Sequence, residues 1–148
     1  MTGRIVVGVD GSAGSVEALR WAVDEARRRG DTVEAVAVWH YPVLAADALS
    51  GTAMPVDVET LARIARDGLE EALARAVPGE AERAAVTRTV VEGSPGHVLV
   101  EAAEGAVLLV VGSRGLGGFA GLLLGSVSNH CVHHAGCPVT VVRPGSGR

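Results

Sequence analysis

Two glycine-bearing segments carry the residues best suited to holding a phosphate group. The first is Asp10-Gly11-Ser12, directly after an apolar run at residues 5–9, and the second extends from Gly112 to Ser126. Six of the 14 residues from Gly112 to Gly125 are glycines, and a main chain without side chains can bring its N–H groups close to an anion. Gly125-Ser126 is also placed to begin a helix, whose first N–H groups attract phosphate. The pattern predicts an oligophosphate cradle, with a loop that merely allows close packing as the alternative.

Two common nucleotide-binding signatures do not fit the second segment. A Walker A loop has a lysine after its last glycine, whereas Ser126-Val127 follows Gly125. Residues 115–120 match the loose GxGxxG/A pattern, but no helix is expected to begin there and no acidic residue follows about 20 residues later at a strand end. A P-loop nucleotidase and a dinucleotide-dependent dehydrogenase are therefore both disfavoured.

Strand and helix patterns alternate along the chain and would position both segments. Apolar runs typical of buried strands cover residues 5–9, 33–39, 85–91, 107–112 and 138–143, and helical periodicity covers 16–29, 58–76, 95–102 and 126–134. Such alternation predicts one α/β domain over residues 1–148, with a mostly parallel, doubly wound sheet covered by helices on both faces. Ligands of such sheets bind beyond the carboxyl ends of the strands, where the strand order reverses.

Composition excludes several classes of protein. The 148 residues include 48% hydrophobic and 3% aromatic residues and carry a net charge of −4, which argues against disorder and against nucleic acid as a partner. No apolar run reaches the roughly 18–20 residues of a membrane span, so we expect no membrane association. Two cysteines near the end of the chain cannot form a disulfide framework, and we expect a cytoplasmic protein.

The spacing Gly112-x2-Gly115-x9-Gly125-Ser126 resembles the G-2x-G-9x-G(S/T) motif of the universal stress protein family, in its ATP-binding branch. Four segments resemble landmarks of that family in the same order, namely VVGVDGS from Val6, EGSPGHVLVEAAE from Glu92, VVGSRG from Val110 and GSVSNHCVHHAGCPVTVVR from Gly125. The resemblance spans essentially the whole chain. It implies an adenine nucleotide alpha hydrolase-like fold, with five parallel strands in the order 3-2-1-4-5 and both glycine segments at one site.

The resemblance also implies roles for individual residues. Asp10 is expected near the ribose and phosphates of ATP, or near a Mg²⁺ ion bound with them, and the main chain of Val38 is expected to contact the adenine. The alternative for Asp10 is an Asx turn or a position just before the helix cap. Ser12 and Ser15 are expected chiefly to cap the first helix, and only secondarily to contact the ligand. The full set of expected ATP contacts is Val9, Asp10, Ser12, Val38, Val111, Gly112, Arg114, Gly115, Gly125, Ser126 and Val127.

These features predict an ATP-binding regulatory stress protein with at most slow ATP hydrolysis. Asp10 is the only firm acid expected near the cradle, and the loop offers no lysine or glutamate for fast phosphoryl transfer. A scaffold that binds no nucleotide, and a genuine ATPase or adenylate-transfer enzyme, are the alternatives. The resemblance further implies a homodimer formed through the last strand, at Val139, Val141 and Val142.

Two further segments leave their roles open. His130 and His134 share a helix face at the spacing of zinc ligands, yet Cys131 lies on the apolar stripe, where cysteine is usually a small buried hydrophobe. A structural metal and ordinary helix packing are therefore both open at this cluster. The connector at residues 40–57 is where we expect contacts with a specific partner.

Overall fold

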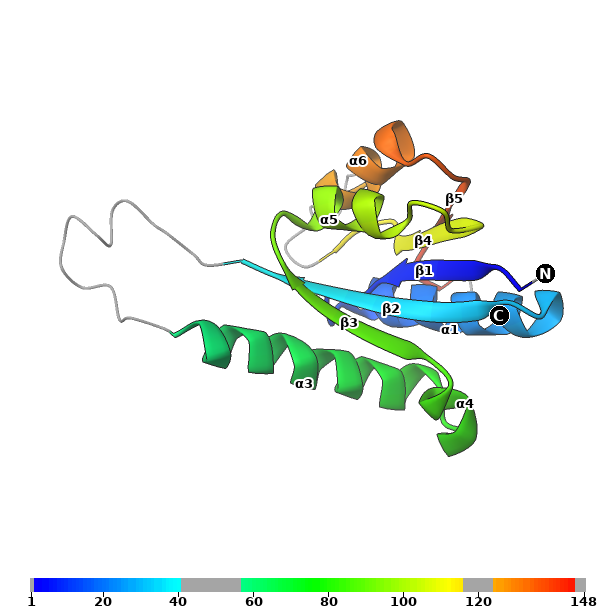
Figure 1. The fold of residues 1–148 in the computed structure, drawn as a ribbon, viewed down its shortest axis with the longest axis horizontal. Helices are drawn as coiled ribbons and strands as arrows, with labels where there is room; N and C mark the ends of the chain where they lie inside the picture. Colours follow the sequence, from blue (N-terminus) through cyan, green and yellow to red (C-terminus); the bar gives the residue numbers. More distant parts are fainter. Residues whose placement is uncertain (1, 41–56, 116–123, 146–148) are drawn as a thin grey trace, which may run out of the picture.

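Five parallel strands form one sheet in the computed structural model, which describes residues 2–40, 57–115 and 124–145. The strand order is β3-β2-β1-β4-β5, as the resemblance implied (Figure 1). The strand order reverses between β1 and β4, because β2 and β3 lie on one side of β1 whereas β4 and β5 lie on the other. Val7 of β1 pairs with Val110 of β4 at this point. The strands are β1 (Arg4–Gly8), β2 (Thr32–Trp39), β3 (Thr87–Glu92), β4 (Leu108–Gly112) and β5 (Val139–Val142).

Helices cover both faces of the sheet (Figure 1). One face packs against α1 (Ala13–Arg29) and α3 (Val58–Ala76), and the other against α5 (Pro95–Ala102) and α6 (Ser126–His134). Alternate residues of β1 serve the two layers, because Ile5 and Val7 belong to the α1–α3 cluster and Val6 to the α5–α6 cluster. Coverage of both faces explains why these strands are continuous apolar runs.

The ends of α1 follow from local chemistry. The Ser12 side chain caps its first turn by accepting a hydrogen bond from the Ser15 N–H, and Gly30 ends it in a left-handed conformation with φ of 75°. Arg27 to Arg29 occupy the last turn, where cations interact favourably with the helix dipole. The expected end of this helix is therefore confirmed.

Two local expectations were wrong, and the end of the first strand differs by one residue. The third strand begins at Thr87 rather than residue 85, because a short helix, α4 (Glu80–Ala84), has Ala85 as its C-cap residue. The first strand ends at Gly8, although the Val9 N–H still donates to the Val36 carbonyl at 2.9 Å. Ser94 occupies the N-cap position of α5, but its side chain makes no capping hydrogen bond.

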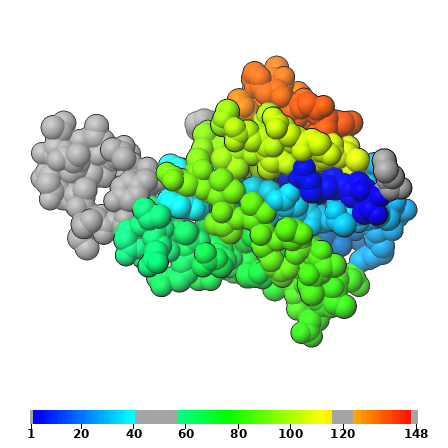
Figure 2. Space-filling model, viewed as in Figure 1, coloured from blue at the N-terminus to red at the C-terminus, as the bar shows by residue number. Residues whose placement is uncertain are grey.

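The two edges of the sheet differ in charge. On one edge, Arg88 of β3 forms an ion pair with Glu70 of α3, with Nε and Oε1 2.6 Å apart. The residues of β3 and α4 lie at the surface next to α3 in the space-filling view (Figure 2). On the other edge, β5 has the sequence VTVV and carries no charged side chain. Charged side chains discourage pairing with another strand, so β5 is the less protected edge.

Candidate functional site

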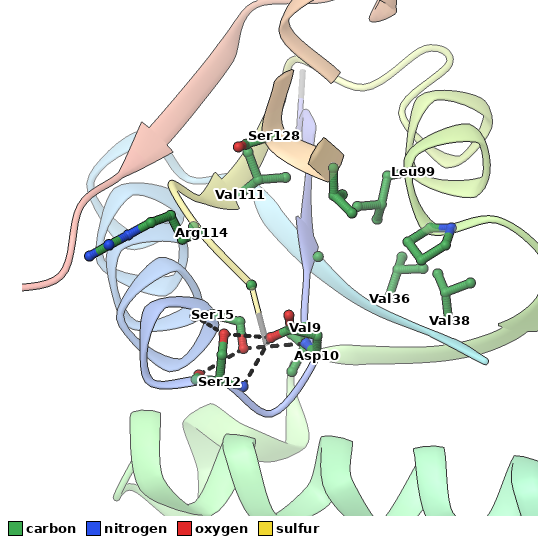
Figure 3. A pocket seen from close by; sticks show the side chains of 15 residues that line it. Val9, Asp10, Ser12, Ser15, Val36, Val38, Leu99, Val111, Arg114 and Ser128 are labelled. Carbon is green, nitrogen blue, oxygen red and sulfur yellow. Dashed lines mark hydrogen bonds between the residues drawn. The ribbon is translucent and has the colours of Figure 1, made fainter. Parts of the chain in front are cut away.

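A cavity of about 110 Å³ lies at the carboxyl ends of β1 and β4, the position expected from the reversal in strand order (Figure 3). Nine of the eleven residues expected at an ATP site line it, and Gly125 and Ser126 do not. The lining residues that had been expected are Val9, Asp10, Ser12, Val38, Val111, Gly112, Arg114, Gly115 and Val127. Those that sequence analysis missed as contacts are Gly8, Ser15, Val36, Pro95, Leu99 and Ser128.

Hydrogen bonds fix the turn between β1 and α1. Asp10 Oδ1 accepts from both the N–H and the hydroxyl of Ser12, at 2.9 and 2.5 Å. The Ser15 hydroxyl donates to the Ser12 carbonyl at 3.0 Å and accepts from the Asp10 N–H at 3.3 Å. Asp10 thus adopts the Asx turn considered from sequence, and the capping expectation for Ser15 was wrong, because Ser15 instead ties the helix back to Asp10. The turn holds the Asp10 carboxylate at the edge of the cavity.

Glycines allow the end of β4 to approach the start of α1. A Cβ atom added to Gly112 would lie 2.9 Å from the Gly14 carbonyl carbon, and one added to Gly14 would lie 3.0 Å from the Arg114 carbonyl oxygen. A Cβ on Gly115 would lie only 2.5 Å from Asp10 Oδ2. The contacts of Gly112 and Gly14 leave no room for side chains, so the two segments meet there main chain against main chain, whereas Gly115 faces the end of the Asp10 side chain. Their expected juxtaposition is therefore present in the described part of the second segment, and residues 116–123 lie outside the description.

The two ends of the second segment are joined by hydrogen bonds. The Gly125 N–H donates to the Ser113 carbonyl at 2.6 Å, and the Ser128 hydroxyl reaches the same carbonyl at 2.9 Å. The Ser113 N–H donates to the Val142 carbonyl of β5 at 2.9 Å. We call Ser113, Gly125 and Ser128 the loop neck. It places the first turn of α6, which begins at Ser126, beside the cavity.

The cavity has one polar and one apolar end. The side chains of Asp10, Ser12 and Ser15 gather at one end, and those of Val36, Val38 and Leu99 lie at the other (Figure 3). Leu99 approaches the main chain of β1 closely, because a Cβ on Gly8 would lie 2.7 Å from its Cδ1 atom. Such a division suits a ligand with an apolar ring system and a charged group, as small-molecule pockets commonly combine an apolar wall with a few polar groups.

The histidine and cysteine cluster on α6 lies outside this cavity. The His130 and His134 rings lie with their centroids 4.4 Å apart and their planes tilted by 38°, and His130 packs against Gly96 of α5. Cys131 is fully buried among apolar side chains, and this burial raises the pKa of its thiol to about 11. Across residues 2–40, 57–115 and 124–145, no three His, Cys, Asp or Glu residues form a group that could hold a metal ion. The fully buried position of Cys131 favours the packing interpretation.

The remaining sequence expectations can be placed only in part. The connector at residues 40–57 lies outside the described residues, apart from His40 and Asp57 at its ends. Asp57 caps α3 by accepting a hydrogen bond from the Thr60 N–H at 2.7 Å, which lowers the pKa of the Asp57 carboxyl. None of the helices in the described part of the chain has the length and apolar character needed to cross a bilayer.

Comparisons with known proteins agree on one family. The model of the universal stress protein family matches residues 1–143. The universal stress protein Rv2005c of Mycobacterium tuberculosis is 42% identical over 142 residues, which cover 94% of this chain but 45% of that protein. The chain therefore spans less than half the length of this curated relative.

Solved structures show the same fold. Universal stress protein UspA from Lactobacillus plantarum superimposes with a TM-score of 0.74 at 26% identity, over 95% of this chain and 97% of that one. A universal stress protein crystallised in complex with cAMP gives a TM-score of 0.59 at 28% identity, over 97% of this chain and 98% of that one.

Proposed function

Because the chain belongs to the universal stress protein family, we propose that it binds ATP in the cavity between β1 and β4 and acts as a nucleotide-responsive regulatory stress protein. The observation that carries this proposal is the contact of Gly112 with Gly14, which brings two turns without side chains to the switch point of the sheet. The cAMP complex of a related protein supports an adenine nucleotide as the ligand class.

The polarity of the cavity gives the proposed ligand a direction. The adenine lies against Val36, Val38 and Leu99, where aliphatic side chains accept a flat ring. Its edge contacts the Val38 main chain, as the family resemblance implies. The ribose and phosphates extend past Gly112 and Gly115 toward the first turn of α6. Ser126 and Gly125, although outside the cavity lining, present the N-terminal end of α6 to the phosphates.

The described cavity lining offers one carboxylate, that of Asp10, to a Mg²⁺ ion bound with ATP. Magnesium usually keeps several waters and takes one or two carboxylates together with phosphate oxygens. Asp10 is the carboxylate of the cavity lining, with Oδ1 engaged by Ser12 and Oδ2 on the side of Gly115. Asp10 would hold the ion or one of its waters, and the ion would reduce the phosphate charge beside this carboxylate.

The lining is better suited to binding than to catalysis. Among its described residues, Asp10 is the one acid and Arg114 the one cation, and neither lysine nor histidine is present. A general base must be oriented toward the attacking water, whereas the Asp10 carboxylate is oriented toward Ser12 by two hydrogen bonds. At most slow ATP hydrolysis is therefore part of the proposal.

The assembly and setting that we propose rest on other features. A second copy of the chain pairs along β5, the uncharged edge, to form a homodimer. We treat residues 1–148 as a single domain and the cytoplasm as its compartment, where ATP is abundant and the thiols of Cys131 and Cys137 stay reduced.

The experiment is to heat-denature the purified chain and analyse the supernatant for ATP, ADP and AMP, and to measure thermal unfolding with and without Mg-ATP. ATP in the supernatant, or a rise in melting temperature with Mg-ATP, is the expected result, because a ligand that binds only the native state stabilises it. Absence of both contradicts the proposal and favours a scaffold that binds no nucleotide. Accumulation of ADP over time favours a genuine ATPase.

A further inference from the structure

The loop neck depends on the buried side chain of Ser128. Ser128 lies on α6, only 2% exposed, and its hydroxyl is 2.9 Å from the Ser113 carbonyl and 3.1 Å from the Gly125 carbonyl. The contact with Gly125 is local, within the first turn of α6. The contact with Ser113 spans 15 residues and joins α6 to the end of β4.

The Ser113 carbonyl is the centre of the neck. It accepts from the Gly125 N–H and from the Ser128 hydroxyl, which together use both lone pairs of a carbonyl oxygen. The Ser113 N–H is bonded in turn to the Val142 carbonyl of β5, so the peptide units around Ser113 are tied to the sheet. Within the neck, Ser128 supplies the one side-chain donor, and Ser113 and Gly125 act through their main chains.

This geometry sets the spacing of the main-chain groups that face the cavity. The Gly125 main chain packs on the segment after Ser113, since a Cβ on Gly125 would lie 3.3 Å from Arg114 Cα and 3.6 Å from the Gly115 nitrogen. Moving α6 away from Ser113 would therefore change the distance between Gly115 and the N-terminal end of the helix. Anion binding by main-chain N–H groups requires that spacing to be held before the ligand arrives.

We propose that Ser128 is a positioning residue for the phosphate-binding main chain, with its hydroxyl holding the first turn of α6 against the end of β4. The role of Ser128 in phosphate binding rests on the proposed function, whereas its role in holding α6 against β4 does not. Without Ser128's hydroxyl, the Ser113 carbonyl keeps only the Gly125 N–H, and the neck opens more often.

The test uses the full chain as wild type and as the variants Ser128→Ala, Ser128→Thr and Ser94→Ala. Hydrogen exchange of the Gly125 amide, measured by NMR without nucleotide, reports opening of the neck directly. Ser128→Ala should accelerate this exchange and weaken Mg-ATP binding, measured by calorimetry, by roughly three- to tenfold each, the effect expected for one lost hydrogen bond. Ser128→Thr keeps a hydroxyl and should restore both values.

Ser94→Ala is the matched control, because Ser94 is exposed and its side chain makes no capping hydrogen bond. It should leave Gly125 exchange and Mg-ATP affinity at the wild-type values. If the Gly125 amide of Ser128→Ala exchanges at the wild-type rate, or if Ser94→Ala accelerates this exchange equally, Ser128 does not hold the loop neck closed. Faster Gly125 exchange in Ser128→Ala with unchanged Mg-ATP affinity would refute the role of Ser128 in positioning the phosphate-binding main chain. Failure of the wild type to bind Mg-ATP would refute the proposed function, and the exchange rates would still decide whether Ser128 holds the loop neck closed.

Discussion

Gly115→Ala is the smallest change that should separate ligand binding from folding. The added Cβ would lie 2.5 Å from Asp10 Oδ2, so this oxygen must move by about 0.9 Å to reach 3.4 Å, where ordinary van der Waals contact begins. That movement exceeds the range of about 0.5 Å over which hydrogen-bond lengths normally vary. Gly115 itself is exposed, so the folded chain should tolerate the methyl group with little change in stability.

The expected loss concerns the contact of Asp10 with Mg-ATP. Removing one hydrogen bond to a charged group costs about 1.5–3 kcal/mol, which corresponds to an increase of about 10- to 100-fold in Kd. At a ligand concentration 100 times the wild-type Kd, ligand stabilisation is about 2.7 kcal/mol for the wild type and falls to about 0.4–1.4 kcal/mol for the variant. For a domain of this size, the wild-type shift in melting temperature is about 5–10 °C.

Thermal unfolding and calorimetry with Mg-ATP measure this loss. Gly136→Ala is the matched control, because Gly136 is exposed and a Cβ there would meet nothing within 4 Å. It should keep the wild-type affinity and ligand-induced shift. If Gly115→Ala binds Mg-ATP within twofold of the wild type, the assignment of Asp10 to the ligand is refuted. If both glycine variants lose affinity equally, the effect does not come from the Asp10 contact.

Three further outcomes follow from described contacts. Gly68→Ala in α3 should raise the free energy of unfolding by about 0.5–1 kcal/mol in urea titrations, since alanine favours helix and a Cβ there would meet nothing within 4 Å. Burial favours the neutral form of the Cys131 thiol and raises its pKa from 9.0 to about 11. The contribution of the neutral thiol to the free energy of unfolding is therefore fully present below pH 9 and is lost as the pH rises to 11. Cys131→Ala should reduce this fall in the free energy of unfolding more than Cys137→Ala, because the thiol pKa of Cys137 is raised at a less buried position. Val141→Lys on β5 should give monomers in sedimentation equilibrium at micromolar concentration, whereas Thr87→Lys on the opposite edge should not; a dimer that survives Val141→Lys means that β5 is not the interface.

Much of the fold could be predicted because its signals are local. The apolar run at residues 5–9 and the glycine at position 30 each indicate one conformation without reference to the rest of the chain, and both expectations agree with the structure to within a residue. The strand order came from the family resemblance rather than from these patterns. Helix α4 was missed because its five residues contain no buried side chain and hence no apolar period.

The site could be predicted less completely, because part of it depends on contacts between distant segments. Gly112 and Gly115 were found through their spacing. Leu99 and Ser128 were not, because nothing in their local sequence shows that α5 would bring one to the apolar end of the cavity, or that the other would reach Ser113. A serine at the third position of a helix is equally typical of an ordinary surface position.

The contact between Gly112 and Gly14 has a consequence for how this protein can change during evolution. Every amino acid other than glycine has a Cβ atom, so every missense mutation at Gly112 places a carbon about 2.9 Å from the Gly14 main chain. No intermediate step exists at this position between the present geometry and its loss. Gradual adjustment of ligand preference must instead occur at Val36, Val38 and Leu99, where side chains of several sizes can be exchanged. The glycine contact at one end of the cavity is thus either retained or lost in a single step, whereas the side chains at the apolar end can change gradually in size.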